Sequence, residues 1–277
     1  MMYSWPTTGR TAMFAELFRK TLRDQRWALL GWACGLAFIS LFLLYFYPFI
    51  SRASEVLKVL DSLPPFIKNL VGKNNFMATP EGFLNLQPFS ILAPLLFIVI
   101  AIGKGGDATA GEEERGTLDL LLSQPLPRWR LVLAKFAADA AALLFLALAF
   151  WGSMAFGTWL FGVAVDWLRL AQVIFSLLLL GLTFLSMSLA IGCLSGKRKL
   201  SLGVSGGFAL VTYLINAYAP MIEGLRSYRI FSPFYYYNGR AVLINGLDPN
   251  HALVLAGLTV VLFAAAIFFF SRRNLSS

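Results

Sequence analysis

Long apolar runs separated by short charged segments dominate the hydrophobic pattern of this 277-residue chain. A helix needs roughly 20 apolar residues to cross a bilayer, because the hydrocarbon core is about 30 Å thick and each residue adds ~1.5 Å. Six runs are long enough to be predicted as membrane-spanning helices: residues 27–49, 84–104, 131–163, 167–194, 200–218 and 251–270. Barrel strands would alternate apolar and polar residues, which these runs do not do. The pattern therefore predicts an all-α polytopic membrane protein, with residues 1–277 forming one transmembrane domain.

The basic residues between the runs predict the orientation of the helices, since cytoplasmic loops carry an excess of Lys and Arg. If the N-terminus is cytoplasmic, fifteen of the 23 Lys and Arg fall on that side. They lie before the first run, between the second and third, in Lys197–Lys199, and at Arg272 and Arg273. Because the number of runs is even, both termini are expected in the cytoplasm.

Composition agrees with a membrane location. The chain is 58% hydrophobic and only 13% charged, whereas about a quarter of the residues in a soluble domain are charged. The net charge of +9 suits short loops that face anionic lipid headgroups. The basic residues are spread over several loops, without a folded domain that would gather them into a nucleic-acid-binding surface. We therefore expect contact with membrane lipids and no nucleic-acid partner.

Three connecting segments have patterns of their own. Residues 13–26 place apolar and basic side chains on different helical faces, which predicts an amphipathic helix in the inner membrane interface. Residues 51–87 repeat apolar positions at helical spacing on both sides of a Pro-Pro pair, which predicts two short amphipathic helices. Segment 219–250 contains three consecutive tyrosines, Tyr235–Tyr237, and we expect this segment to dip into the outer interface.

Residues 111–128 form the largest segment predicted in the cytoplasm. Thr117 is a suitable N-cap for a helix, and the acidic residues before it suit the positive end of that helix. Leu118, Leu121 and Leu122 then share one face, and two prolines stop the helix. Such an exposed leucine face either binds a partner or packs against the ends of the chain's own helices. Spacing alone favours neither alternative.

This segment resembles the signature of type-2 ATP-binding-cassette exporter permeases, a pattern close to E-x-x-x-G-T-L-x-x-L-L-S-x-P-x-x-R. The residues that fill the pattern in order are Glu112, Gly116, Thr117, Leu118, Leu121, Leu122, Ser123, Pro125 and Arg128. Further similarities lie at residues 79–83, at Lys135 and at residues 232–235. Because the six runs also stand in the expected order, the resemblance covers nearly the whole chain.

The resemblance implies a permease that pairs with a second permease copy, identical or different, and binds two copies of a cytoplasmic ATP-binding-cassette ATPase. The segment between the second and third runs would contain the coupling helix, which sits in a groove of the ATPase. The residues implied for this interface are Glu112, Glu113, Glu114, Gly116, Thr117, Leu118, Leu121, Leu122, Pro125 and Arg128. The three leucines would fill the groove, while the glutamates would contact the ATPase or neighbouring cytoplasmic helices. Lys197, Arg198 and Lys199 would form a second, smaller cytoplasmic contact.

The sequence contains no recognisable machinery for ATP hydrolysis. A phosphate loop has the pattern G-x-x-x-x-G-K-[ST] after a buried strand, and the glycine-rich stretch Gly103–Asp107 has neither the spacing nor that context. The single histidine, His251, is insufficient for a zinc site of the usual ligand count or for a catalytic triad on the cytoplasmic side. We expect no catalytic residue, metal site or cofactor in this chain, with ATP and Mg²⁺ bound by the partner ATPase.

Asp139 is the clearest charge inside a predicted span. Lys135 lies one turn earlier on the same face, which predicts a local ion pair. Without a second deep carboxylate, an ion-coupled secondary carrier is disfavoured. The favoured function is ATP-driven export across the plasma (inner) membrane of a prokaryote. The alternative is a sensory or scaffold subunit that binds an ATPase without transporting a substrate.

Overall fold

The computed structural model describes residues 7–56, 79–117, 127–222, 224, 227–239 and 241–273, with the side chains of residues 15–49 in the first of these ranges. All secondary structure in these ranges is helical. Six of the described helices are long and apolar enough to cross a membrane, which confirms the predicted all-α polytopic class. They cover Ala15–Phe49, Pro80–Glu114, Arg128–Leu160, Trp167–Ser195, Arg198–Tyr218 and Pro249–Arg272.

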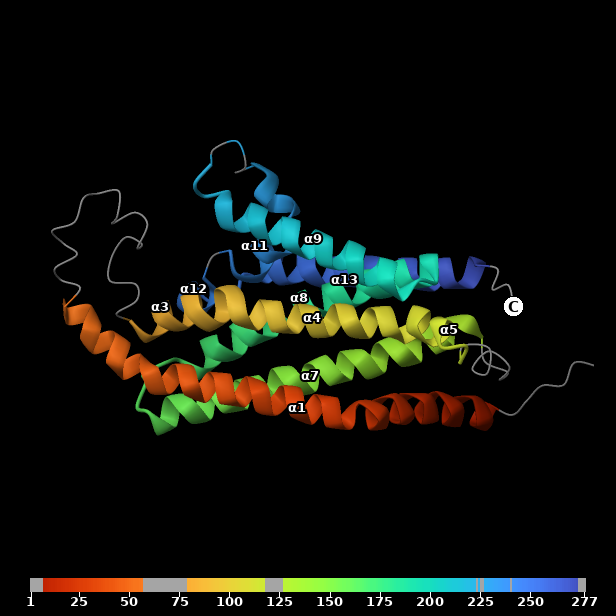
Figure 1. The fold of residues 1–277 in the computed structure, drawn as a ribbon, viewed down its shortest axis with the longest axis horizontal. Coiled ribbons are helices and arrows are strands. Elements are labelled where there is room, and N and C mark those ends of the chain that lie inside the picture. The colour runs from red at the N-terminus through yellow and green to blue at the C-terminus, as the bar shows by residue number, and fades with distance from the viewer. Residues whose placement is uncertain are drawn as a thin grey trace, which may run out of the picture.

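The spans form one elongated helical bundle (Figure 1). Its longest elements are α1 (Thr7–Val56), α4 (Ala93–Gly106), α7 (Arg128–Leu160), α8 (Trp167–Ser195), α9 (Arg198–Tyr218) and α13 (Pro249–Arg272). α1 packs along α7, whereas α8 contacts α4, α7, α9 and α13. α9 runs at an angle to the other helices (Figure 1). The bundle is therefore organised around α8.

α8 is central because its apolar side chains meet other helices on several sides. Leu177, Leu180 and Phe184 are all buried in one continuous core. Close to the end of α4, a Cβ atom added to Gly105 would lie only 2.5 Å from the main-chain oxygen of Leu185 in α8. Glycine thus permits α4 and α8 to approach more closely than a larger residue would allow.

The N-terminal amphipathic segment is part of the first span. Residues 13–26, predicted as an amphipathic helix in the inner interface, are helical, and α1 runs without a break from Thr7 to Val56; their position in the interface stays a prediction. Its only proline, Pro48, lies far beyond that segment, so nothing interrupts the backbone hydrogen bonds near residue 26. Leu17 is buried with Val132 of α7 and Phe270 of α13. The apolar face of this segment therefore packs on the protein itself.

The second span continues well beyond the predicted limit at residue 104. Its consecutive elements are α3 (Pro80–Leu84), the π-helical η3 (Asn85–Leu92), α4, the π-helical η4 (Asp107–Gly111) and α5 (Glu112–Glu114). The sequence pattern missed the last part because charged residues end the apolar run there. In the structure those charges are paired with basic side chains of other helices, so the helix can continue past the apolar region.

The connection between α9 and α13 contains η5 (Ser227–Phe231), α11 (Pro233–Asn238) and α12 (Val242–Asn245). Tyr237, expected at the outer interface, is buried in the core, and its hydroxyl donates to the main-chain oxygen of Phe89 at 2.8 Å. This burial raises the pKa of Tyr237. The other region with predicted amphipathic helices, residues 57–78, lies outside the described residues.

Candidate functional site: a charged network at one end of the bundle

One end of the bundle, here called the charged end, contains both the start of α1 and the end of α13 (Figure 1). The end of the second span, the start of α7 and the connection from α8 to α9 lie there as well (Figure 1). Leu118, Leu121, Leu122 and Pro125, the centre of the predicted coupling helix, lie outside the described residues. The site can therefore be built from the two flanks of residues 118–126 and from the helices around them.

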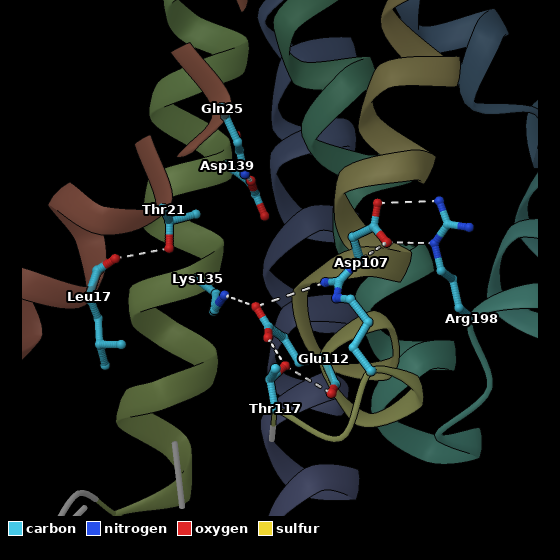
Figure 2. A network of polar contacts seen from close by, with 10 residues as sticks. Leu17, Thr21, Gln25, Asp107, Glu112, Thr117, Lys135, Asp139 and Arg198 are labelled. Atoms are coloured by element: carbon cyan, nitrogen blue, oxygen red, sulfur yellow. Dashed lines mark hydrogen bonds and ion pairs between the residues drawn. The ribbon is translucent and has the colours of Figure 1, made fainter. Parts of the chain in front are cut away.

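Glu112 is the centre of a polar cluster on the first flank (Figure 2). Its Oε1 lies 2.7 Å from Nζ of Lys135 on α7 and 4.0 Å from Nη2 of Arg115. The hydroxyl of Thr117 donates to the Glu112 carboxylate and also lies 3.1 Å from its main-chain oxygen. These contacts join the end of the second span to α7.

Gly116 ends the second span through its backbone conformation. Its φ is +68°, a left-handed conformation that only glycine adopts readily. The amide of Gly116 donates to the carbonyl of Glu113 at 3.0 Å, and the amide of Thr117 to that of Glu112 at 3.0 Å. This pair of hydrogen bonds is a Schellman motif, which satisfies carbonyl groups at the C-terminus of a helix. The Gly-Thr pair of the signature therefore has a local structural role.

The acidic residues lie at the C-terminal end of the second span, where the helix dipole is unfavourable for negative charge. Basic groups from neighbouring elements offset this. Asp107 binds Arg198 of α9, with Oδ2 at 3.3 Å from Nη2, and Arg115 at 3.8 Å. Glu114 accepts a hydrogen bond from the main-chain amide of Arg198 at 2.9 Å. The α8–α9 connection is thus attached to the first flank.

Arg273 brings the end of α13 to both flanks. Its guanidinium pairs with the carboxylate of Glu113 on the first flank. Its main-chain oxygen accepts a hydrogen bond from Nη1 of Arg128 on the second flank at 2.7 Å. The two flanks are therefore connected through one residue that is far from both in the sequence.

Asp139 is buried beneath this network, but its partner is not the one predicted. Lys135 forms an ion pair with Glu112 instead. Oδ1 of Asp139 lies 3.8 Å from Nζ of Lys104 and accepts a hydrogen bond from Gln25 at 2.9 Å. Gln25 also accepts a hydrogen bond from Lys104. The predicted local pair within α7 is thus wrong, because partners on α4 and α1 lie within reach of Asp139.

A polar cavity of about 470 Å³ opens among these residues. It is lined by Leu17, Lys20, Thr21, Asp24, Gln25, Lys104, Asp107, Ala108, Glu112, Arg115, Thr117, Lys135 and Asp139. The positive and negative side chains in this lining balance in number, and several are already paired. The cavity is therefore not expected to attract anions or cations strongly. It is better suited to holding water and to an exchange of partners among its ion pairs.

Several of the predicted interface residues make contacts with other helices of this chain. The structure brings together Glu112–Glu114, Thr117, Arg128 and Arg198, and it leaves Lys197 and Lys199 exposed. These contacts are with the chain's own helices, and their place in an ATPase interface stays a prediction. The reasoning missed Asp107 and Arg273 as network residues. Their only sequence signal was a charge next to the end of a predicted span.

Two comparisons with known proteins agree with the resemblance seen in the sequence. The chain is similar to the probable ABC transporter permease protein NosY of Pseudomonas aeruginosa, with 33% identity over 141 residues. That match covers 50% of this chain and 49% of NosY, so the chain spans about half the length of this curated relative. The family model of the ABC-2 family transporter protein matches residues 15–275. Because this match includes all six described spans, the chain belongs to the ABC-2 transporter family.

Proposed function

We propose that this chain is the permease subunit of an ATP-binding-cassette exporter in the plasma membrane of a prokaryote. A separate cytoplasmic ATPase binds ATP and Mg²⁺ and supplies the energy of hydrolysis. The assembly contains two permease copies and two ATPase subunits. In this proposal the charged end faces the cytoplasm, and residues 118–126 form the coupling helix with Leu118, Leu121 and Leu122 in the ATPase groove.

The observation that carries the proposal is the convergence of ion pairs on the first flank of residues 118–126 and of a charged hydrogen bond on the second. On the first flank, Glu112 binds α7, Asp107 binds α9, and Glu113 binds the end of α13. On the second flank, Arg128 binds the end of α13. A force on the intervening segment would reach several spans at once, which is the mechanical requirement for converting ATPase movement into helix movement.

The unoccupied basic side chains support a second ATPase contact. Arg198 is committed to Asp107 and Glu114, so we assign it a positioning role within the permease. Its neighbours Lys197 and Lys199 are exposed and would meet acidic residues of the ATPase. A surface contact of this kind contributes little affinity by itself but favours correct orientation.

Co-purification with the cognate ATPase tests the assignment of the coupling helix. Replacing Leu118 and Leu122 together by Asp should reduce ATPase binding at least about tenfold, because charged groups would have to enter an apolar groove. A matched control replaces Leu57 and Leu60 by Asp, which follow the opposite end of α1. If the coupling-helix variant binds the ATPase as well as wild type, the assignment is wrong.

A flux measurement separates transport from the sensory or scaffold role. Inside-out vesicles that contain the permease and ATPase should take up a transported compound only when ATP is hydrolysed. A panel of amphipathic compounds is a suitable first set, with a hydrolysis-deficient ATPase as the control. ATPase binding without ATP-dependent uptake across a broad panel would favour the sensory or scaffold function.

A further inference from the structure

The guanidinium group of Arg273 joins three segments at the charged end. Nη2 pairs with Oε1 of Glu113 in α5, and Nη1 lies 3.5 Å from the main-chain oxygen of Cys193 in α8. The main-chain oxygen of Arg273 accepts the hydrogen bond from Arg128 at the start of α7. Its own main-chain amide donates to Phe269 within α13 at 3.1 Å. Arg273 thus caps the C-terminus of α13 and binds α5, α7 and α8.

Gly196 provides the space in which this guanidinium lies. A Cβ atom at this position would be only 2.0 Å from Nη2 of Arg273 and 2.6 Å from its Cζ. Gly196 also has a φ of +65° and ends α8, with its amide bonded to the carbonyl of Gly192 at 2.8 Å. Any side chain at this position would displace the guanidinium of Arg273, so the absence of a side chain at Gly196 permits the contact.

The ion pair with Glu113 is more than a mobile surface contact. The side chains of Arg273 and Glu113 are only 22% and 30% exposed. The second carboxylate oxygen of Glu113, Oε2, is buried and has no hydrogen-bond partner among the described residues. If Arg273 is removed, Glu113 retains a partly buried charge without its counter-ion, which is costly. Glu113 therefore depends on Arg273 for its position.

These contacts place Arg273 at a junction between the last span and residues 118–126, here called the coupling segment. Glu113 precedes residues 118–126 and Arg128 follows them, and both bind the same residue. Above the junction, Phe270 of α13 is buried together with Val132 of α7 and Cys193 of α8. Packing and hydrogen bonds thus connect both flanks to the end of α13 as well as to α7.

We propose that Arg273 is a positioning residue that ties both ends of the coupling segment to α13, so that α13 moves with this segment during the ATPase cycle. The inference rests on the proposed function and adds a route for the movement. An anchor that served folding alone would affect the stability of the permease but would leave the relation between ATPase binding and ATPase stimulation unchanged.

The test uses the full-length permease in nanodiscs with its cognate ATPase. We measure ATPase binding and the stimulation of ATP hydrolysis by the bound permease for Arg273→Glu, Glu113→Arg and the charge-swapped double variant. Arg273→Glu should bind the ATPase within about twofold of wild type, and both single variants should show about tenfold less stimulation when compared at equal ATPase occupancy. The double variant should recover at least half of it. Arg272→Glu is the matched control, because the neighbouring Arg272 is exposed and stacks on Phe268 of its own helix.

A glycine pair gives an independent test in case the charge variants fold poorly. Gly196→Ala should reduce the stimulation, since it fills the space occupied by Arg273. Gly162→Ala is its control, because Gly162 has nearly the same φ, +64°, but no atom within 4 Å of the added Cβ. Equal effects of both substitutions would show backbone strain only and would overturn the inference.

The outcomes separate the two proposals. If wild-type permease binds no ATPase, the proposed function fails, and the inference fails with it. If wild type binds and stimulates the ATPase while Arg273→Glu stimulates it equally, only the inference is overturned. Loss of stimulation in both single variants without recovery in the charge-swapped variant also overturns it, because the pair itself would then not be the cause.

Discussion

The two ends of the bundle are held together by different chemistry. At the charged end, carboxylates and basic side chains that range from buried Asp139 to half-exposed Asp107 and Arg115 surround a cavity of about 470 Å³. At the opposite end, neutral groups make the buried links: Tyr237 donates to Phe89, Ser176 donates to the main-chain oxygen of Tyr237 at 2.7 Å, and Asn238 donates to Asn85 at 3.0 Å. The hydrogen bond from Arg169 to the main-chain oxygen of Ile244, a charged link at this end, is exposed. Tyr237 itself is only 2% exposed.

The difference indicates which end can rearrange at low cost. A half-exposed ion pair can exchange its partner for water, a salt ion or another protein with little change in free energy. A buried neutral hydrogen bond has no such substitute, and breaking it leaves an unsatisfied group. The half-exposed pairs of Asp107 with Arg115 and Arg198 are thus suited to changing contacts with a partner, whereas the links around Tyr237 keep the opposite end fixed.

The largest expected effect comes from the buried pair beneath the charged network. Asp139→Ala leaves Lys104 partly buried without its carboxylate and should lower the free energy of unfolding by about 3 kcal/mol. The measurement is the unfolding of purified permease in mixed detergent micelles. Replacing both residues, with Lys104→Met and Asp139→Leu, should restore stability to within about 1 kcal/mol. An equal loss in the single and double variants would contradict this account.

The opposite end should respond with a smaller and salt-independent loss. Tyr237→Phe removes the donor to Phe89 and should cost about 2 kcal/mol, because the carbonyl oxygen of Phe89 stays buried. The same unfolding assay at low and high salt checks both the size and the salt independence. Tyr236→Phe, at a half-buried position, is the control and should have a smaller effect. A strong salt dependence for Tyr237→Phe would remove the contrast between the two ends.

The helix end at Gly116 should be less sensitive again. Gly116→Ala forces alanine into a left-handed conformation and should destabilise the permease by about 1 kcal/mol. Gly152→Ala is the control, since Gly152 lies within α7 and has open space at the Cβ position. There alanine should be neutral or slightly stabilising. If Gly116→Ala is as well tolerated as Gly152→Ala, the Schellman motif contributes little.

The smallest effect is expected for an exposed ion pair of the network. Arg198→Gln should lower stability by about 0.5 kcal/mol at low salt. This loss should disappear near 1 M salt, where the screening length is about 3 Å. Thermal unfolding across a salt series, with Lys199→Gln as the exposed control, measures it. A salt-independent loss above about 2 kcal/mol would place Arg198 among the fixed contacts instead.

The six spans were predictable because their lengths reflect bilayer thickness, a property that each apolar run carries locally. The extension of the second span to Glu114 could not be predicted from the hydrophobic pattern. Asp107 and Glu112–Glu114 interrupt the hydrophobic pattern in the same way as a loop would, and their basic partners come from α7, α9 and α13. A pattern within one helix contains no information on which other helix will lie beside it.

The candidate site shows the same limit at the level of individual contacts. Helical spacing brought Lys135 and Asp139 together, but spacing measures only proximity within α7. In the structure Lys135 binds Glu112 and Asp139 binds Lys104, because helix packing offers each a partner from another element. The pair of Glu113 and Arg273 joins positions that are 160 residues apart in the chain, and no periodicity could indicate it.

The continuity of α1 has a consequence for the depth of the polar cavity. At ~1.5 Å per residue, the part of α1 from Ala15 to Arg26 is ~17 Å long, and it precedes the predicted apolar run. Trp27, which is 73% exposed with Arg26 stacked on its ring, is a typical marker of a lipid headgroup layer. Lys20, Asp24 and Gln25 on the cavity wall come before this marker. We therefore expect the α1 side of the cavity to lie at headgroup depth, where water could enter and hydrate its charges.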